Sequence, residues 1–344
     1  MIKLRMVLTL FGFLIVFSSF LPVVAEAFGP WPGDNDHDAM AIDLGNPLYT
    51  ELFSELSRDH QFTKEELSQL FQGLSVNKRV LELMDTQWEA KPYYLYRPRF
   101  VTDEIIREGK ARIAEHAALL KGIQEEFDVE KEAVIAIWGV ESRFGRKEGS
   151  FNIFQTLNSL FYAYPRRSQF YRGELINFLL LCRENGVDPR NITGSYGGAF
   201  GQTQFIPSSF REYAVDYDRD GRRDVWRSTA DVLASIANYL HCFGWILNAP
   251  VYRELGPSLK DPALVAAYNK GRKGFINWQE VNRLQGVELD APPGNKDVTI
   301  VGLELADGGM RYIAGYPNFQ AITAWNNSNR YAMVISELAG LLRE

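Results

Sequence analysis

The chain has 344 residues, of which 46% are hydrophobic and 23% charged, so it can bury a large core and is not compositionally disordered. The formal net charge is -6 at pH 7 and no basic stripe offsets it, which argues against nucleic acid as a partner. Aromatic residues make up 13% of the chain. We expect most of them in the core and a minority at a binding groove.

The N-terminus has the pattern of a secretory signal peptide. A short basic region at 1–5 precedes an almost wholly apolar run at 6–21, and small residues suited to cleavage follow at 22–27. The apolar run is short and wrongly flanked for a membrane span, although an uncleaved anchor is the alternative. No cysteine follows the run, so we expect no lipid anchor. We predict a signal peptide at 1–27.

The next two segments differ in composition. Residues 28–47 are rich in glycine, proline and aspartate, which predicts a flexible lead. Residues 48–126 carry apolar side chains at helical period, with an Arg-Pro-Arg break at 97–99, which predicts a helical accessory lobe. We place the core domain at 127–344.

A lone carboxylate stands out at the start of this core. Residues 133–145 carry apolar side chains at helical spacing and bring Glu141 to the last helical turn, just before Gly145. Apolar neighbours and the negative end of the helix dipole both favour the protonated form of such an acid. A protonated carboxyl near neutral pH can act as a general acid. The alternative is a glutamate that points into water.

A glycine-dense loop at 195–210, with Pro-Ser-Ser near its end, follows some fifty residues later. Its glycines let the backbone approach a ligand, and Ser195, Gln202 and Gln204 can donate and accept hydrogen bonds, as sugar recognition requires. For both glutamines the alternative is a hydrogen bond that satisfies the loop itself. Residues 207–209, Pro-Ser-Ser, read as a helix start and are assigned to the scaffold.

An acidic segment reproduces the first half of an EF-hand calcium loop. Asp216, Asp218, Asp220 and Gly221 have the required alternation, but Arg227 occupies the place of the bidentate glutamate. The alternative is an Asp-Gly turn with solvated acids. A bound calcium ion would be structural, and we expect no cofactor for catalysis.

Later in the chain, turn and strand composition predict a β-hairpin at 296–316, followed by a final helix at 329–342. Cys182 and Cys242 lie in helical, apolar surroundings, and both a disulfide and two buried free thiols fit. Neither reads as a nucleophile, and the four histidines form no metal-ligand pattern.

Three motifs, at 138–145, 195–209 and 216–226, occur in the order typical of the lytic murein transglycosylase B family, which this chain closely resembles. The resemblance is continuous from about Leu48 to the C-terminus. It implies a mainly α (α+β) fold with a lysozyme-like catalytic core and a small β excursion. It also implies cleavage of the bond between N-acetylmuramic acid and N-acetylglucosamine in peptidoglycan, which leaves a 1,6-anhydromuramoyl end.

The resemblance assigns roles residue by residue. Glu141 maps onto the family's single acid and base. Trp325 stands where the family usually has a tyrosine in an Arg-Tyr-Asn sequence, so we expect it to line the substrate site, against the alternative of a core aromatic. Together the substrate-binding candidates are Ser195, Tyr196, Gln202, Gln204, Tyr239, Trp325 and Asn326. The expected metal loop, 216–231, uses Asp216, Asp218, Asp220, the carbonyl of Arg222, and Asp231.

One carboxylate suffices in this reaction because the sugar's own hydroxymethyl oxygen closes onto the anomeric carbon. We expect the other acids near the motifs, Asp128, Glu148 and Glu174, to be solvated at the surface. If one of them faced Glu141, a hydrolytic muramidase would be the better interpretation, and a non-catalytic peptidoglycan-binding protein is the other rival. We expect a periplasmic monomer that acts on peptidoglycan glycan strands, with cell-wall synthesis proteins as candidate partners.

Overall fold

The computed structural model describes residues 40–85 and 91–344. The predicted signal peptide and most of the predicted flexible lead lie outside the described residues. The end of the lead is held in place, because Ile42 N donates to Leu74 O at 3.0 Å and Val76 N donates to the carbonyl at position 40 at 2.9 Å.

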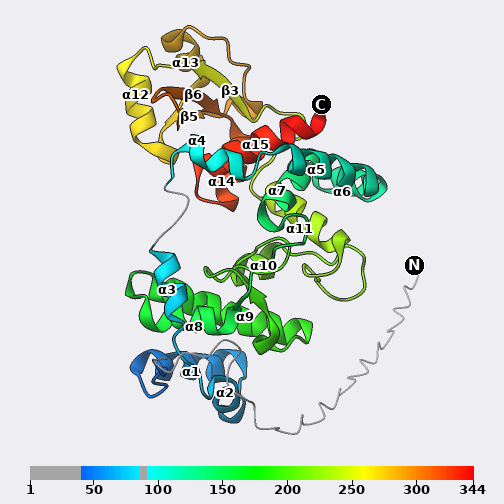
Figure 1. Ribbon diagram of the computed structural model, residues 1–344, viewed down its shortest axis with the longest axis vertical. Coiled ribbons are helices and arrows are strands. Elements are labelled where there is room, and N and C mark those ends of the chain that lie inside the picture. The colour runs from blue at the N-terminus through cyan, green and yellow to red at the C-terminus, as the bar shows by residue number, and fades with distance from the viewer. Residues whose placement is uncertain (1–39, 86–90) are drawn as a thin grey trace, which may run out of the picture.

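Three helices open the described chain at one end of the molecule (Figure 1): α3 packs on α8, α1 packs on α9, and α2 packs on α1. Each of the three begins after a side chain that accepts a hydrogen bond from a backbone N–H of the first turn, which fixes where the helix starts. The bounds are α1 (Pro47–His60), α2 (Lys64–Phe71), α3 (Lys78–Met84), α8 (Ile153–Ala163) and α9 (Ser168–Asn185).

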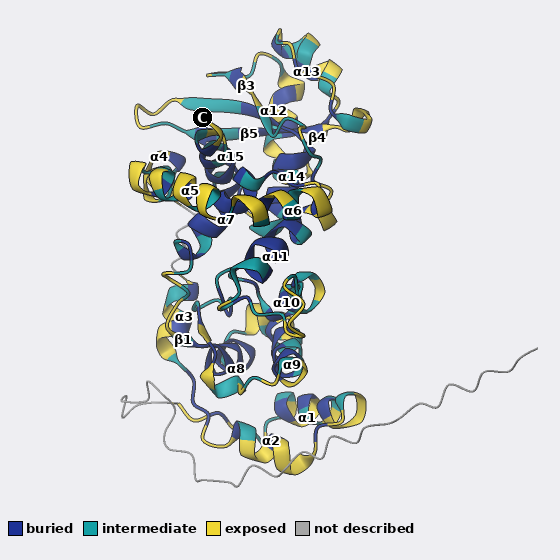
Figure 2. Cartoon of the chain, turned by 90° about the vertical axis from the view of Figure 1, so that its right-hand side faces the viewer, coloured by how far each residue is buried: buried dark blue, intermediate teal, exposed yellow. Residues whose placement is uncertain are grey.

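Helix α7 (Lys131–Ser142) lies at the centre of the molecule and is buried on nearly all sides. It contacts α5, α6, α11 and α15, of which α5 and α6 also have faces exposed to solvent (Figure 2). This surrounding explains why the sequence of α7 is apolar all round rather than along one stripe. The bounds of its neighbours are α4 (Tyr93–Tyr96), α5 (Asp103–Glu115), α6 (Ala117–Phe127), α11 (Thr229–Cys242), α14 (Pro317–Trp325) and α15 (Asn329–Arg343).

The segment expected to form one helical lobe, 48–126, is divided between two places. Helices α1–α3 lie with α8 and α9, whereas α5 and α6 pack against α7, α11 and α15 (Figure 1). One large core cluster runs through both places, from Ile42 to Leu342. The domain boundaries themselves remain a prediction.

Strand β1 (Phe151–Asn152) pairs antiparallel with β2 (Thr193–Gly194), and this pair anchors the start of the glycine-dense loop. A side chain at Gly194 would place its Cβ 2.1 Å from the carbonyl oxygen of Ala199, so only glycine fits where the loop folds back on itself. The loop ends where α10 (Pro207–Tyr213) begins. As the sequence indicates, Pro207 is the first residue of this helix.

A four-stranded antiparallel sheet forms the other end of the molecule, in the order β3-β6-β5-β4 (Figure 1). Strands β5 and β6 are the predicted hairpin, and β3 and β4 extend it on both sides. With α12 and α13 the sheet encloses a second, smaller core cluster. The bounds are β3 (Tyr252–Gly256), β4 (Phe275–Ile276), β5 (Val298–Glu304), β6 (Met310–Gly315), α12 (Pro262–Asn269) and α13 (Trp278–Gln285).

The predicted fold class, mainly helical with a small β part, is confirmed. Short 3-10 helices join the main elements at Arg97–Arg99, Pro165–Arg167, Pro189–Asn191, Gly271–Lys273 and Pro293–Asn295. Within 40–85 and 91–344, none of the helices has both the length and the apolar character that a bilayer crossing requires.

The two cysteines are not joined. Cys182 is buried in α9, whereas Cys242 is exposed at the end of α11, so the alternative of two buried thiols is wrong for Cys242. Burial raises the pKa of both thiols above the ordinary value.

Candidate active site

Glu141 lies in the last turn of α7 and is half-buried, in the place that the sequence indicates. The helix ends because Arg143 adopts a left-handed conformation, with φ of 53°, and its N–H bonds back to Gly139. The hydroxyl of Ser142 accepts a hydrogen bond from Gly145 N at 3.0 Å, which holds the chain as it leaves the helix. The backbone on both sides of Glu141 is therefore fixed.

Two aromatic side chains from the C-terminal helices donate hydrogen bonds to the same oxygen of Glu141. Trp325 Nε1 lies 2.9 Å from Oε1, and the Tyr331 hydroxyl lies 2.5 Å from it. Complete burial, together with the nearby Glu141 carboxylate, raises the pKa of Tyr331 well above its ordinary value. The phenol thus stays neutral and remains a hydrogen-bond donor.

Trp325 is held in turn by other aromatic rings. Its ring centroid lies 5.0 Å from that of Phe205 and 4.7 Å from that of Tyr239. The Tyr239 hydroxyl donates to Ala324 O at 2.8 Å, and burial raises its pKa, so it is a fixed support for Trp325. Asn326 follows directly, and its carbonyl accepts a hydrogen bond from Ser328 N at 2.6 Å. The structure brings Tyr239, Trp325 and Asn326 to Glu141's side of the molecule as a connected group.

Gln202 joins the glycine-dense loop to α7. Its amide oxygen accepts a hydrogen bond from Trp138 Nε1 at 2.9 Å, and its amide nitrogen donates to Trp226 O at 2.7 Å. A Cβ at Gly145 would lie 2.6 Å from this amide oxygen, so glycine is required there. Both amide atoms are engaged within the protein. This favours the alternative left open by the sequence, in which Gln202 satisfies the loop instead of binding substrate.

Gln204 is arranged differently. Its φ is 50°, and its amide nitrogen donates to Glu148 O at 2.9 Å and Gly201 O at 2.8 Å. Within the described part of the chain its amide oxygen has no such bond, so this oxygen remains able to accept one from a ligand.

Ser195 and Tyr196 lie at the start of the same loop and are both half-buried. The hydroxyl oxygen of Ser195 accepts a hydrogen bond from Ala199 N at 3.1 Å, which leaves the hydroxyl proton to donate. The Tyr196 ring packs 6.4 Å from that of Phe151. The loop therefore offers a ligand one donor, the hydroxyl of Ser195, and one acceptor, the amide oxygen of Gln204.

Asp128, Glu148 and Glu174 are the candidates for a second carboxylate, and no hydrogen bond between described residues joins any of these three acids to Glu141. Asp128 is exposed, as expected, at the end of α6. Glu174 is only 5% exposed, so the expectation of a solvated surface acid is wrong for it. It accepts hydrogen bonds from the backbone N and the hydroxyl of Ser208 at 2.9 and 2.7 Å. Glu148 is half-buried, and burial and the charge of Asp224 raise its pKa.

The acidic segment brings three carboxylates together. Ligand oxygens of Asp216, Asp218 and Asp231 lie within 4.8 Å of one another, and Asp231 is fully buried. Burial raises the pKa of Asp231, whereas backbone N–H groups of Asp224 and Tyr217 oppose that shift. Three like charges so close repel one another, and oxygen ligands of this kind suit a calcium ion that neutralises them. The residues present therefore fit the ion.

Asp220 is not one of these three acids. Its carboxylate accepts a hydrogen bond from Arg222 N at 2.8 Å. The role of Asp220 and of the Arg222 carbonyl in holding a metal remains a prediction.

Sequence reasoning missed Tyr331 and Trp138. Tyr331 follows Trp325 by six residues and appears as a core aromatic at helical spacing in α15. The available signal was physical, since a buried phenol needs a polar partner. Trp138 was part of a motif, yet nothing in that motif shows that its indole N–H reaches Gln202.

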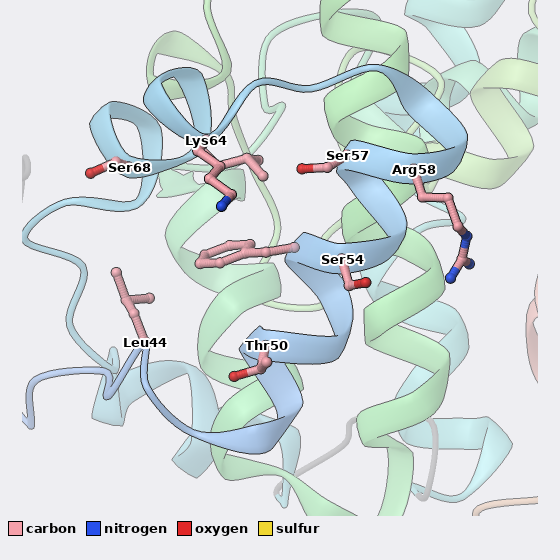
Figure 3. A pocket seen from close by; sticks show the side chains of 9 residues that line it. Leu44, Thr50, Ser54, Ser57, Arg58, Lys64 and Ser68 are labelled. Atoms are coloured by element: carbon pink, nitrogen blue, oxygen red, sulfur yellow. The ribbon is translucent and has the colours of Figure 1, made fainter.

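A separate cavity of about 770 Å³ lies between α1 and α2 (Figure 3). Hydroxyls of α1 and Lys64 of α2 line it. None of its lining residues is a candidate site residue, and it belongs to a different part of the molecule from Glu141.

The helical fold and the half-buried Glu141 beside a glycine-dense loop define a lysozyme-like enzyme of the glycan-cleaving class. A family model described as "Transglycosylase SLT domain" matches residues 46–340. Membrane-bound lytic murein transglycosylase B of Escherichia coli (strain K12) is 31% identical over 309 residues, which is 85% of this chain and 82% of the relative. The chain belongs to the SLT transglycosylase domain family, and the family resemblance and enzyme class predicted from the sequence are confirmed.

Solved structures agree. The soluble lytic transglycosylase SltB1 of Pseudomonas aeruginosa matches with a TM-score of 0.75 and 36% identity, over 85% of this chain and 97% of the other. The Escherichia coli lytic transglycosylase Slt35 in complex with calcium matches with a TM-score of 0.75 and 29% identity. The match covers 89% of this chain and 96% of the other. Pseudomonas aeruginosa SltB3 in complex with NAG-NAM-pentapeptide matches with a TM-score of 0.72 and 30% identity. The match covers 86% of this chain and 79% of the other.

Proposed function

We propose that this protein is a peptidoglycan lytic transglycosylase. It cleaves the β-1,4 bond between N-acetylmuramic acid and N-acetylglucosamine and leaves a 1,6-anhydromuramoyl end. The observation that carries this proposal is the Glu141 carboxylate, which Trp325 and Tyr331 hold through one oxygen. Family membership supports the same reaction.

The position of the two donors indicates which oxygen of Glu141 does the chemistry. Trp325 Nε1 and the Tyr331 hydroxyl both reach Oε1, so Oε1 accepts hydrogen bonds in either protonation state. The transferable proton is therefore carried on Oε2. The two aromatic donors act as positioning residues that fix the plane of the carboxyl group.

The reaction then needs no second carboxylate. Oε2 gives its proton to the glycosidic oxygen as the bond from that oxygen to the anomeric carbon breaks. The hydroxymethyl oxygen of the same muramoyl residue bonds to the anomeric carbon, and its proton passes to Glu141. Atoms balance without water, and the acid is restored for the next turnover.

Mass spectrometry of the products released from purified sacculi tests this proposal. The expected muropeptides end in anhydromuramic acid and are lighter by one water than hydrolytic products. Reducing muramoyl ends would instead establish a hydrolytic muramidase. The Glu141→Gln variant is the control, because it keeps the shape of the side chain while it removes the titrating proton. The amount of muropeptide that this variant releases should fall to background.

The protein also holds a structural calcium ion in this proposal. Asp216, Asp218 and Asp231 are the ligands that the geometry supports, and the relative Slt35 was solved in complex with calcium. Calcium stabilises the 216–231 loop, and the loop supports the neighbouring site through Gln202, whose backbone N donates to Val225 O at 2.9 Å. No step of the reaction involves the ion.

The protein is exported to the periplasm by its cleavable signal peptide, where it meets the glycan strands of peptidoglycan. The composition of residues 1–27 supports this location. Fractionation of cells that express the full chain, with mass spectrometry of the mature N-terminus, checks it. Retention of residues 1–27 in a membrane fraction would establish the uncleaved anchor instead.

A further inference from the structure

A second cavity, of about 310 Å³, lies beside the glycine-dense loop. Its walls come from the end of α9, from β2, from Glu148 and from residues 222–227. The cavity belongs to the calcium-loop side of the molecule, and none of the residues that hold Glu141 lines it.

This cavity is joined to the catalytic group by a short series of contacts. Trp226, which lines it, accepts a hydrogen bond from Gln202 at 2.7 Å, and Gln202 in turn accepts one from Trp138 at 2.9 Å. Trp138 lies three residues before Glu141 in α7. Glu148, also in the wall, accepts a hydrogen bond from Gln204 at its carbonyl. The cavity wall and the helix that carries Glu141 are thus connected through the side chains of Gln202 and Trp138.

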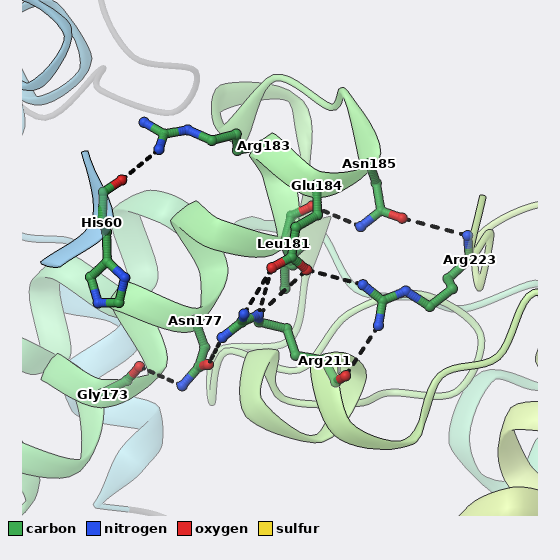
Figure 4. A network of polar contacts seen from close by, with 9 residues as sticks. All are labelled: His60, Gly173, Asn177, Leu181, Arg183, Glu184, Asn185, Arg211 and Arg223. Atoms are coloured by element: carbon green, nitrogen blue, oxygen red, sulfur yellow. Dashed lines mark hydrogen bonds and ion pairs between the residues drawn. The ribbon is translucent and has the colours of Figure 1, made fainter. Parts of the chain in front are cut away.

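One wall of the cavity is rigid. Arg223 donates to Glu184 at 3.0 Å and to Arg211 O at 3.1 Å (Figure 4). Its guanidinium also lies over the Phe210 ring. Asn185 donates to the carbonyl of Leu181 at 2.8 Å (Figure 4). The side chains of Arg223 and Asn185 are thus committed to the fold.

Two other arginines in the cavity wall lack such contacts. Arg222 and Arg227 are exposed, and within 40–85 and 91–344 neither side chain forms an ion pair or a hydrogen bond. The nearby acid Asp224 already accepts hydrogen bonds from Trp226 N and Arg227 N at 3.0 and 2.9 Å. Two guanidinium groups therefore line the cavity without a carboxylate partner, which favours an anionic ligand.

Glu148 adds a second feature. Its carboxyl is half-buried in the same wall, where no hydrogen bond reaches it from the described residues. A ligand that carries both a carboxylate and an ammonium group would therefore meet opposite charges at each group: the two arginines for its carboxylate and Glu148 for its ammonium. Amino acids with a free amine and a free carboxyl have this character, whereas uncharged sugar rings do not.

We propose that this cavity binds the peptide stem of peptidoglycan through a stem carboxylate held by Arg222 and Arg227, with Glu148 facing a stem amine. The inference rests on the proposed function, because the stem is attached to the muramoyl residue on which Glu141 acts. It assigns to the cavity the recognition of stem-bearing strands over bare glycan.

The test compares glycan strands that carry stems with strands from which an amidase has removed them, at fixed calcium concentration. The Arg227→Gln variant should lose about tenfold in kcat/KM on stem-bearing strands, which corresponds to about 1.4 kcal/mol. It should stay within about twofold of the unaltered protein on peptide-free strands. The matched control is Arg283→Gln, which removes the same charge from an exposed position on α13 outside the cavity wall and should change neither rate.

Equal losses on both substrates, or no loss on either, would overturn the inference. If the unaltered protein gave reducing ends or cleaved neither substrate, the proposed function would fail separately. A direct measurement then still decides the stem site. Calorimetry on the Glu141→Gln variant should show tighter binding of NAG-NAM-pentapeptide than of the bare disaccharide. The additional Arg227→Gln change should abolish that difference, and equal affinities at the outset would refute the site.

Discussion

The Tyr331→Phe substitution tests how Glu141 is held. It removes one hydroxyl, 2.5 Å from Oε1, and leaves the ring to fill a position that is 2% exposed. A hydrogen bond to a charged group contributes about 1.5–3 kcal/mol, which corresponds to a loss of roughly 10- to 150-fold in rate. We expect that loss in kcat with little change in KM, because the hydroxyl contacts the acid and not the sugar.

Turnover of purified sacculi across a pH range is the assay. Loss of a donor to the carboxylate disfavours its charged form, so the limb of the pH–rate profile that reports the catalytic acid should move to higher pH. A purely structural role for Tyr331 would not move that limb. Trp325→Phe, which removes the other donor to the same oxygen, should move it in the same direction.

Tyr49→Phe is the matched control. It removes an equally buried hydroxyl, which donates to Asn158 at 2.8 Å between α1 and α8. We expect a stability loss of about 1 kcal/mol and an unchanged kcat. An unaltered pH–rate profile in Tyr331→Phe, or equal kcat losses in both variants, would refute the positioning role.

Three further predictions concern stability and reactivity. Calcium should raise the Tm of the unaltered protein by roughly 5 °C, and Asp216→Asn should remove most of that rise without lowering the Tm in chelator; equal shifts in both media would exclude the metal site. Burial raises the pKa of Glu174 above 4.5, so its contribution to stability is full below pH 4.5 and is lost as pH rises through the folded-state pKa. Urea unfolding should therefore show the stability of the unaltered protein falling relative to Glu174→Gln as pH rises above 4.5, and a constant difference would contradict this. A thiol reagent should label Cys242 in the native protein and Cys182 only after unfolding, and rapid labelling of both would be inconsistent with the burial of Cys182.

The features that the sequence predicts well are local ones. The position of Glu141 follows from apolar spacing within one helix and the break after it. The hairpin of β5 and β6 follows from two short β-rich runs around an Asp-Gly-Gly turn, in which Gly308 has a φ of 83°. In each case the residues that decide the structure are neighbours in the chain.

Contacts between distant segments could not be predicted in this way. Tyr331 and Glu141 are separated by 190 residues, and no local pattern indicates which buried phenol reaches which acid. Strand β4 has two residues, and β3 carries Arg253 and Glu254, so both resemble loops until β5 and β6 supply partners. Glu174 reads as a surface acid because its partner, Ser208, belongs to another helix.

The central claim is that Glu141 alone exchanges protons with the sugar. A crystal structure of the Glu141→Gln variant with a bound glycan strand tests it most directly. We expect the side chain at position 141 to lie within hydrogen-bond distance of the scissile oxygen, with Trp325 and Tyr331 still beside it. A side chain turned away from that oxygen, or a second carboxylate across the sugar that holds a water molecule, would contradict the account.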